Sequence, residues 1–169
     1  IAELSEAVLT FEQRAVREKK ALIYNENDDI IPVMGDKNRL RQVFVNIIDN
    51  ALKYSDEGGS VTISAIRLEN GFVDIVVKDT GIGIHEEDIH KLFKEFQRLD
   101  LETNRNIEGT GLGLAITHNL VSMMGGKMEV KSVYGEGTTF TVCLTQKMIS
   151  GEPIGEFDKN YAKRCRFTN

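Results

Sequence analysis

Cysteine is scarce in this chain of 169 residues, which contains only Cys143 and Cys165. One cysteine lies in a predicted strand and the other in a polar tail, so the pair has no metal-ligand spacing and is too small a set for a disulfide framework. The three histidines, His85, His90 and His118, are scattered and do not pair with the cysteines. We therefore expect no zinc site, and the low cysteine content fits a reducing cytoplasm.

Long apolar runs and a basic surface are also missing. No stretch reaches the apolar length needed to span a bilayer, and the first residues form no secretory signal. The net charge of −5 argues against a nucleic-acid surface, because phosphate backbones are bound by clustered basic side chains. The chain begins at Ile1 instead of Met, so we expect a piece of a longer cytoplasmic protein that could itself be membrane-anchored.

The composition is that of a folded, soluble domain, with 41% apolar and 28% charged residues. We expect one domain over residues 1–146 and a polar linker or tail over 147–169. Apolar periodicity predicts helices at 3–20, 37–54, 86–94 and 112–124, and strands at 21–25, 60–68, 72–79, 127–134 and 138–145. This segregation predicts an α+β fold, a two-layer α/β sandwich with a mixed sheet and the helices on one face.

Local signals place three of the element ends. Asp36 is a suitable N-cap for the helix over 37–54. Asn70 and Gly71 form a strong hairpin signal between two β-branched runs. Gly125 and Gly126 are typical of a helix C-cap after residue 124.

Polar residues interrupt the apolar helix over 37–54 at a helical spacing. Asn46, Asn50 and Lys53 share one face, so two amides and an ammonium can converge on a metal-phosphate group. Mg²⁺ prefers hard oxygen ligands and keeps several waters, which makes one amide oxygen plus triphosphate oxygens a sufficient set. Asn50 is therefore the candidate metal ligand, although an asparagine pair on such a helix is more often a capping or solvated feature.

Three glycine-rich segments follow this helix. Gly109, Gly111 and Gly113 lack Cβ atoms, so their backbone can approach a phosphate beside the positive end of the next helix. Each segment alone is equally compatible with a simple turn. The three segments are Asp79-Thr80-Gly81-Ile82-Gly83, Gly109-Thr110-Gly111-Leu112-Gly113-Leu114 and Gly135-Glu136-Gly137-Thr138.

The helix segment that contains Asn46, Asn50 and Lys53 and the three glycine-rich segments form four motifs. In this order, they resemble the N, G1, G2 and G3 boxes of the ATP-binding domain of sensor histidine kinases. Residues 92–98 are similar to the F box that lies between G1 and G2. The resemblance covers about residues 1–146 and implies a Bergerat-type fold with a mainly antiparallel sheet. It also implies ATP and Mg²⁺ as cofactors, and transfer of the γ-phosphoryl group to a histidine on a separate dimerisation domain, for relay to a response-regulator aspartate. We expect the chain itself to be monomeric.

The resemblance also assigns roles around the nucleotide base. Asp79 would accept a hydrogen bond from the exocyclic amine of adenine, Gly83 would leave room for the ring, and Thr138 would assist through its hydroxyl. Tyr54 would pack on the base. The alternatives are a turn-capping role for Asp79 and a core position for Tyr54.

The phosphate contacts would come from cations and from the glycine-rich backbone. Lys53 and Arg98 are the main candidates, and Arg105 is equally compatible with solvation in a polar segment, 97–108, that we interpret as a mobile lid. The predicted catalytic residues are Asn46, Asn50, Lys53 and Arg98. The predicted cofactor-binding residues are Tyr54, Asp79, Gly81, Gly83, Ile84, Arg105, Gly109, Thr110, Gly111, Leu112, Gly113 and Thr138.

The phosphoacceptor histidine is not among these residues. No H box is present, and the three histidines are better interpreted as surface residues. Related ATPases such as gyrase, MutL and the heat-shock chaperones have a glutamate at the position of Asn46, and an amide cannot serve as the general base for hydrolysis. Transfer to a protein nucleophile is therefore favoured. A serine-directed anti-sigma kinase and a non-catalytic nucleotide-responsive module remain as alternatives.

Overall fold

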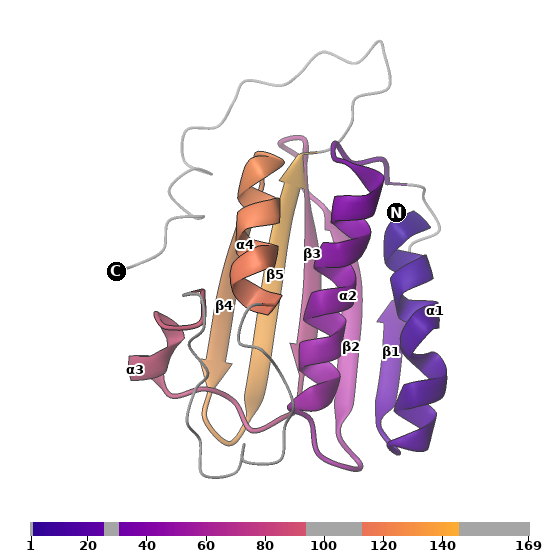
Figure 1. Cartoon of the computed structure of the whole chain (residues 1–169), viewed down its shortest axis with the longest axis vertical. Helices are drawn as coiled ribbons and strands as arrows, with labels where there is room; N and C mark the ends of the chain where they lie inside the picture. Colours follow the sequence, from indigo (N-terminus) through magenta and orange to yellow (C-terminus); the bar gives the residue numbers. More distant parts are fainter. Residues whose placement is uncertain (1, 26–30, 94–112, 146–169) are drawn as a thin grey trace.

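The computed structural model describes residues 2–25, 31–93 and 113–145 (Figure 1). Five strands form one sheet in the order β1-β2-β3-β5-β4. β1 pairs in parallel with β2, and every other neighbouring pair is antiparallel. The strands are β1 Ala21–Asn25, β2 Ser60–Arg67, β3 Phe72–Asp79, β4 Lys127–Val133 and β5 Gly137–Thr145.

Three helices cover one face of this sheet, side by side (Figure 1). They are α1 Ala2–Arg17, α2 Lys37–Lys53 and α4 Gly113–Met123, while the short α3 Glu86–Ile89 lies near the end of β4. The predicted two-layer α+β fold, with a mixed and mainly antiparallel sheet, is confirmed. None of the helices in the three described ranges is long and apolar enough to cross a bilayer.

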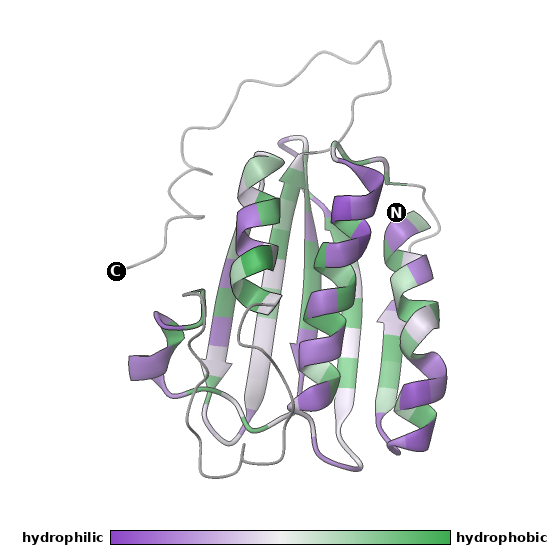
Figure 2. Ribbon diagram, viewed as in Figure 1, coloured by the Kyte–Doolittle hydropathy of each residue, from purple (hydrophilic) through white to green (hydrophobic). Residues whose placement is uncertain are grey.

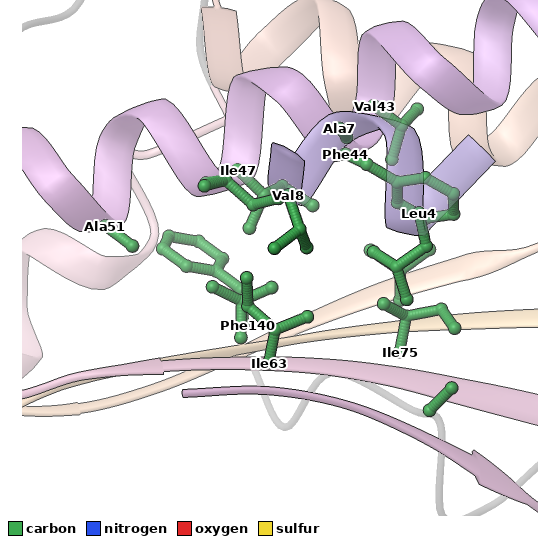
Figure 3. Close-up of a cluster of buried hydrophobic side chains, with 14 of the residues drawn as sticks. Leu4, Ala7, Val8, Val43, Phe44, Ile47, Ala51, Ile63, Ile75 and Phe140 are labelled. Carbon is green, nitrogen blue, oxygen red and sulfur yellow. The ribbon is translucent and has the colours of Figure 1, made fainter. Parts of the chain in front are cut away.

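The core lies between the helices and the sheet because buried residues alternate along most of β2 and β3. Val61 and Ile63 of β2 and Ile75 of β3 point toward the helices and are at most 1% exposed. Figure 3 shows apolar side chains of α1 and α2 meeting Ile63, Ile75 and Phe140. Polar residues of α2 lie on the side turned away from the sheet (Figure 2). The sheet therefore determines which side of α2 is available for other contacts.

Helix α1 ends earlier than the predicted residue 20. Lys19 adopts a left-handed conformation with φ of 52°, and its N–H donates to the Val16 carbonyl. The next N–H, of Lys20, reaches back to the Ala15 carbonyl at 2.9 Å, which completes a Schellman motif. Glycine usually occupies the left-handed position, so a lysine there gave no signal in the sequence.

The predicted helix over 86–94 is also shorter in the structure. Beyond Ile89 the chain forms turns, in which the N–H of Lys91 donates to Asp88 and that of Leu92 to Ile89. These are three-residue steps, so the segment does not continue as an α-helix.

The predicted caps and hairpin are confirmed. The Asp36 carboxylate accepts a hydrogen bond from the N–H of Arg39 at 3.0 Å, Gly71 has φ of 79° between β2 and β3, and Gly125 has φ of 73° after α4. The division at residues 146 and 147 lies outside the described residues and stays a prediction.

Two leucines on α1 provide a test of where the core lies. Leu4 is 0% exposed and Leu9 is 62% exposed. We expect Leu4→Ala to lower the free energy of unfolding by about 2–5 kcal/mol, because the truncation leaves a cavity under the helix. Leu9→Ala should change it by less than about 0.5 kcal/mol. Urea denaturation measures both, and equal losses would show that α1 does not pack as described.

Candidate functional site

The polar candidates gather at one end of the domain. The end of α2, the end of β3 and the beginning of β5 lie toward the lower end in Figure 1, and α4 begins above them, beside the middle of α2. Antiparallel pairing of β3 with β5 places Asp79 directly opposite Thr138. The structure thus brings together the described parts of four motifs that are separated by up to about ninety residues.

Asn46 connects α2 to the first turn of α4 through hydrogen bonds. Its Nδ2 donates to the Thr117 hydroxyl at 3.1 Å and, more weakly, to the Gly113 carbonyl at 3.5 Å. Thr117 is fully buried and its hydroxyl donates to the same carbonyl at 2.7 Å. The amide nitrogen of Asn46 is therefore committed to the protein, and its oxygen is the atom that remains for another partner. Its predicted catalytic role stays a prediction.

Asn50 and Lys53 follow on the next turn of α2. The Asn50 amide makes no hydrogen bond to the described residues and is partly exposed. The Lys53 ammonium pairs with Asp49 at 2.8 Å, and the other oxygen of Asp49 accepts a hydrogen bond from Arg14 at 2.6 Å. This pairing of Lys53 with Asp49 was not predicted from the sequence, and the predicted role of Lys53 as a phosphate cation stays a prediction.

Asp79 is a buried carboxylate at the end of β3, only 3% exposed. A single oxygen, Oδ1, accepts the N–H of Gly81 at 2.9 Å and that of Thr138 at 3.3 Å. Desolvation raises the pKa of Asp79 above its ordinary value, although the two backbone hydrogen bonds oppose the shift. Within the described ranges Oδ2 receives no hydrogen bond, so this oxygen retains its capacity to accept one.

The glycines after Asp79 are needed for contacts between backbones. A Cβ on Gly81 would lie 2.1 Å from the Tyr54 carbonyl oxygen, and one on Gly83 would lie 2.1 Å from the Val133 carbonyl oxygen. Gly83 also has φ of 67°. Close packing against β4 therefore requires a glycine at position 83, and the room that Gly83 would leave for an adenine ring stays a prediction.

Tyr54 lies at the C-terminal end of α2. Its N–H donates to the Asn50 carbonyl at 3.1 Å, and its own carbonyl accepts the N–H of Ile82 at 3.2 Å. Its main chain therefore connects the helix to the loop after Asp79. The ring is partly exposed, and its predicted packing on a base stays a prediction.

Ser132 is a site residue that the sequence analysis missed. Its hydroxyl accepts the N–H of Ile84 at 2.8 Å, donates to the Gly137 carbonyl at 2.9 Å and lies 2.8 Å from the Thr138 hydroxyl. It thereby connects the loop after β3 with the turn between β4 and β5. Alternation along β4 turns this serine inward with Met128, and a polar residue at an inward position was the available signal.

Several predicted residues lie outside the described residues. These are Arg98, Arg105, Gly109, Thr110, Gly111 and Leu112, together with the proposed lid over 97–108. Gly113 begins α4, and a Cβ there would meet no described atom within 4 Å. At the other end of this gap, Phe93 stacks on His118 of α4 with ring centroids 4.8 Å apart.

Comparison with known proteins identifies the kind of domain. The family described as histidine kinase-, DNA gyrase B-, and HSP90-like ATPase matches residues 35–148. The chain belongs to this family. Within it, the chain is 45% identical over 126 residues to the sensor histidine kinase WalK of Bacillus subtilis, covering 74% of this chain and 21% of WalK. It is 39% identical over 128 residues to the circadian input-output histidine kinase CikA of Synechococcus elongatus, covering 76% of this chain and 17% of CikA.

Solved structures agree with this assignment. The mycobacterial sensor histidine kinase MprB is 25% identical, with a TM-score of 0.71 over 88% of this chain and 95% of the MprB chain. Full-length ShkA in complex with AMPPNP is 27% identical, with a TM-score of 0.75 over 88% of this chain and 30% of ShkA. The chain is thus the catalytic, ATP-binding type of domain of sensor histidine kinases, as the motifs indicated. It spans about a fifth or less of the curated relatives named above.

The raised pKa of Asp79 predicts a pH-dependent effect of Asp79→Asn. The folded state favours the neutral acid, so the contribution of Asp79 to stability is fully present below the pKa of the unfolded chain. It is lost as pH rises through the raised pKa of the folded state. Asparagine stays neutral, and its Oδ1 can accept the same two N–H groups. We expect the variant to gain stability relative to the native domain between about pH 4 and neutrality, measured by urea unfolding. A difference independent of pH would contradict this.

Substitutions at two glycines distinguish a glycine that the fold requires from one that the fold does not require. Gly81→Ala should lower the free energy of unfolding by about 1–3 kcal/mol or more, because the Tyr54 backbone beside it cannot yield easily. Gly113→Ala should leave stability unchanged or raise it by up to about 1 kcal/mol, since alanine favours helices. Urea denaturation compares the two, and equal destabilisation would refute the distinction.

Proposed function

We propose that this domain binds Mg-ATP at the end where α2, β3 and α4 meet, and presents the γ-phosphoryl group to a histidine on a separate dimerisation domain. That histidine would pass the phosphoryl group to an aspartate on a response-regulator receiver domain. The chain spans only a small part of its relatives, and both partners would be other domains or proteins. We place the domain in the cytoplasm as a monomer, within a parent kinase that a separate segment could anchor in a membrane.

The observation that supports this proposal most strongly is the buried Asp79 carboxylate. Both protein donors bind Oδ1, and an exocyclic amine such as that of adenine can donate to Oδ2. A hydrogen bond to a charged acceptor contributes about 1.5–3 kcal/mol, so a ligand that donates to Oδ2 would be stabilised by about that amount. Guanine presents a carbonyl at the equivalent ring position and would face the carboxylate with an acceptor, so we expect a preference for adenine.

The magnesium ion would be held by the Asn50 amide oxygen and by phosphate oxygens. The fit is one of donor chemistry, since an amide oxygen is a hard ligand and Asn50 makes no hydrogen bond to the described residues. When bound, Mg²⁺ neutralises charge on the phosphates. Lys53, Arg98 and the Gly109–Gly113 backbone would hold the remaining phosphate oxygens, with Arg105 as a weaker candidate.

The reaction requires alignment and charge neutralisation more than covalent chemistry from the protein. Asn46 supports transfer to a protein nucleophile in preference to water, because an amide does not act as a general base and its nitrogen is already bonded to Thr117. The related ShkA was solved with AMPPNP, which agrees with an ATP-type ligand at this fold.

Calorimetric titration tests the assignment. We expect Mg-ATP to bind the native chain, and Asp79→Asn to weaken ATP by roughly 5- to 150-fold, the equivalent of the unmatched hydrogen bond, with little effect on GTP. Asn50→Ala should remove Mg²⁺ dependence and phosphoryl transfer to a supplied histidine domain, while leaving more nucleotide binding than Asp79→Asn leaves.

Asn38→Ala is the matched control, because Asn38 is an exposed asparagine in the first turn of the same helix. It should bind and transfer like the native chain. No binding at millimolar nucleotide by the folded native chain would refute the proposal. Normal binding with no transfer to a competent histidine domain would favour a non-catalytic, nucleotide-responsive module.

A further inference from the structure

An ion-pair chain connects α1 to the flank of α2 that contains Asn50 and Lys53. The Asp49 carboxylate binds a different cation with each oxygen, Arg14 at 2.6 Å through Oδ1 and Lys53 at 2.8 Å through Oδ2. The three side chains are 24–29% exposed, so water screens these pairs less than it screens fully exposed pairs. Removing the charge of any one of these three side chains therefore changes the electrostatic interactions of the other two.

Arg14 is the fixed member of this chain. Its Nε binds Glu18 at 2.7 Å, and its guanidinium lies over the Phe11 ring at 5.9 Å. Desolvation lowers the pKa of Arg14, but the hydrogen bonds and charges of Glu18 and Asp49 outweigh it and raise the pKa overall. Lys20 binds Glu18 at 2.8 Å and the Leu52 carbonyl at 2.7 Å, which holds Glu18 in place.

Lys53 is the member that can move. It has one carboxylate partner among the described residues, and its ammonium sits on a flexible four-carbon stem with three donors. A triphosphate near Asn50 would offer it a stronger partner than Asp49 does. If Lys53 turned toward that ligand, Asp49 would keep Arg14 alone and would not become an unpaired, partly buried charge.

We propose that Asp49 and Arg14 are positioning residues, and that they control how readily Lys53 exchanges its carboxylate partner for a nucleotide phosphate. Asp49 competes with the phosphate for Lys53. Arg14 weakens that competition, because it neutralises Asp49 once Lys53 has left. This inference rests on the nucleotide site proposed above, and adds to it two residues that the N, G1, G2 and G3 motifs do not identify as ligands.

The two residues should consequently have opposite effects on binding. Asp49→Asn frees Lys53 and should tighten Mg-ATP by about threefold to tenfold at low salt. Arg14→Gln makes Lys53 the only remaining cation on Asp49 and should weaken Mg-ATP by a similar factor. The double variant should behave like Asp49→Asn, because Arg14 acts through a carboxylate that is no longer there. Arg14→Lys keeps the charge and should restore much of the native affinity.

Calorimetric titration of the 169-residue chain and its variants with Mg-ATP and with adenosine is the test. Adenosine has no phosphate, so its affinity should be the same in all of them. Exposed changes of the same charge, Arg17→Gln on α1 and Asp56→Asn after α2, control for long-range electrostatics and should shift ATP affinity less. Thermal unfolding checks that each variant is folded at the titration temperature.

The outcomes distinguish failure of the proposed role of Asp49 and Arg14 from failure of the proposed nucleotide site. Opposite shifts for ATP, a double variant equal to Asp49→Asn and constant adenosine affinity would support the role of the pair. Shifts in the same direction, or a double variant equal to the sum of the two single effects, would overturn it while leaving ATP binding intact. Failure of the native chain to bind ATP would overturn the nucleotide site, and this inference with it.

Discussion

The orientation of α2 is the constraint on which the remaining arrangement depends. Seven of its side chains are at most 2% exposed, and they pack against the sheet and against α1 and α4. These residues are Leu40, Val43, Phe44, Ile47, Ile48, Ala51 and Leu52. Each contributes about 1–3 kcal/mol, depending on its size, so rotating the helix would be very costly. Because successive residues are separated by about 100°, this burial directs Asn46 toward α4 and Asp49 toward α1.

Close contacts between backbones fix the other side of the site. Gly81 lies against the end of α2, Gly83 against the end of β4, and Gly137 against Asp79 itself. Side chains at these positions would push the loop away from its neighbours. Ser132 then joins the loop to the β4–β5 turn through hydrogen bonds. The buried carboxylate of Asp79 is thereby held rigidly, which favours recognition of one ligand geometry over others.

An acidic chain that is proposed to bind an anionic nucleotide must control its few local cations. The net charge is −5, and the described cations near the end of α2 are paired with carboxylates. Such pairing stabilises the domain modestly and keeps the cations in place. It also connects Lys53 to α1, because Asp49 pairs with both Lys53 and Arg14. A change in the position of α1 would therefore alter the ion pairing of Lys53 at the proposed phosphate site.

Most of the helices and strands, the caps at Asp36 and Gly125 and the candidate motifs could be predicted from the amino-acid sequence, because they depend on spacing between residues that are close along the chain. The 3.6-residue period of α2, the alternation of the strands, the Asp36 cap and the Asn50 position all follow from such spacing. The partners of these residues, in contrast, depend on how the helices and the sheet pack together. The left-handed Lys19, the serine between two loops, the contact of Gly83 with β4 and the pairing of Arg14 with Asp49 depend on conformations and contacts that no local pattern encodes. Arg14 and Asp49 are 35 positions apart, and packing of α1 against α2 brings them within hydrogen-bond distance.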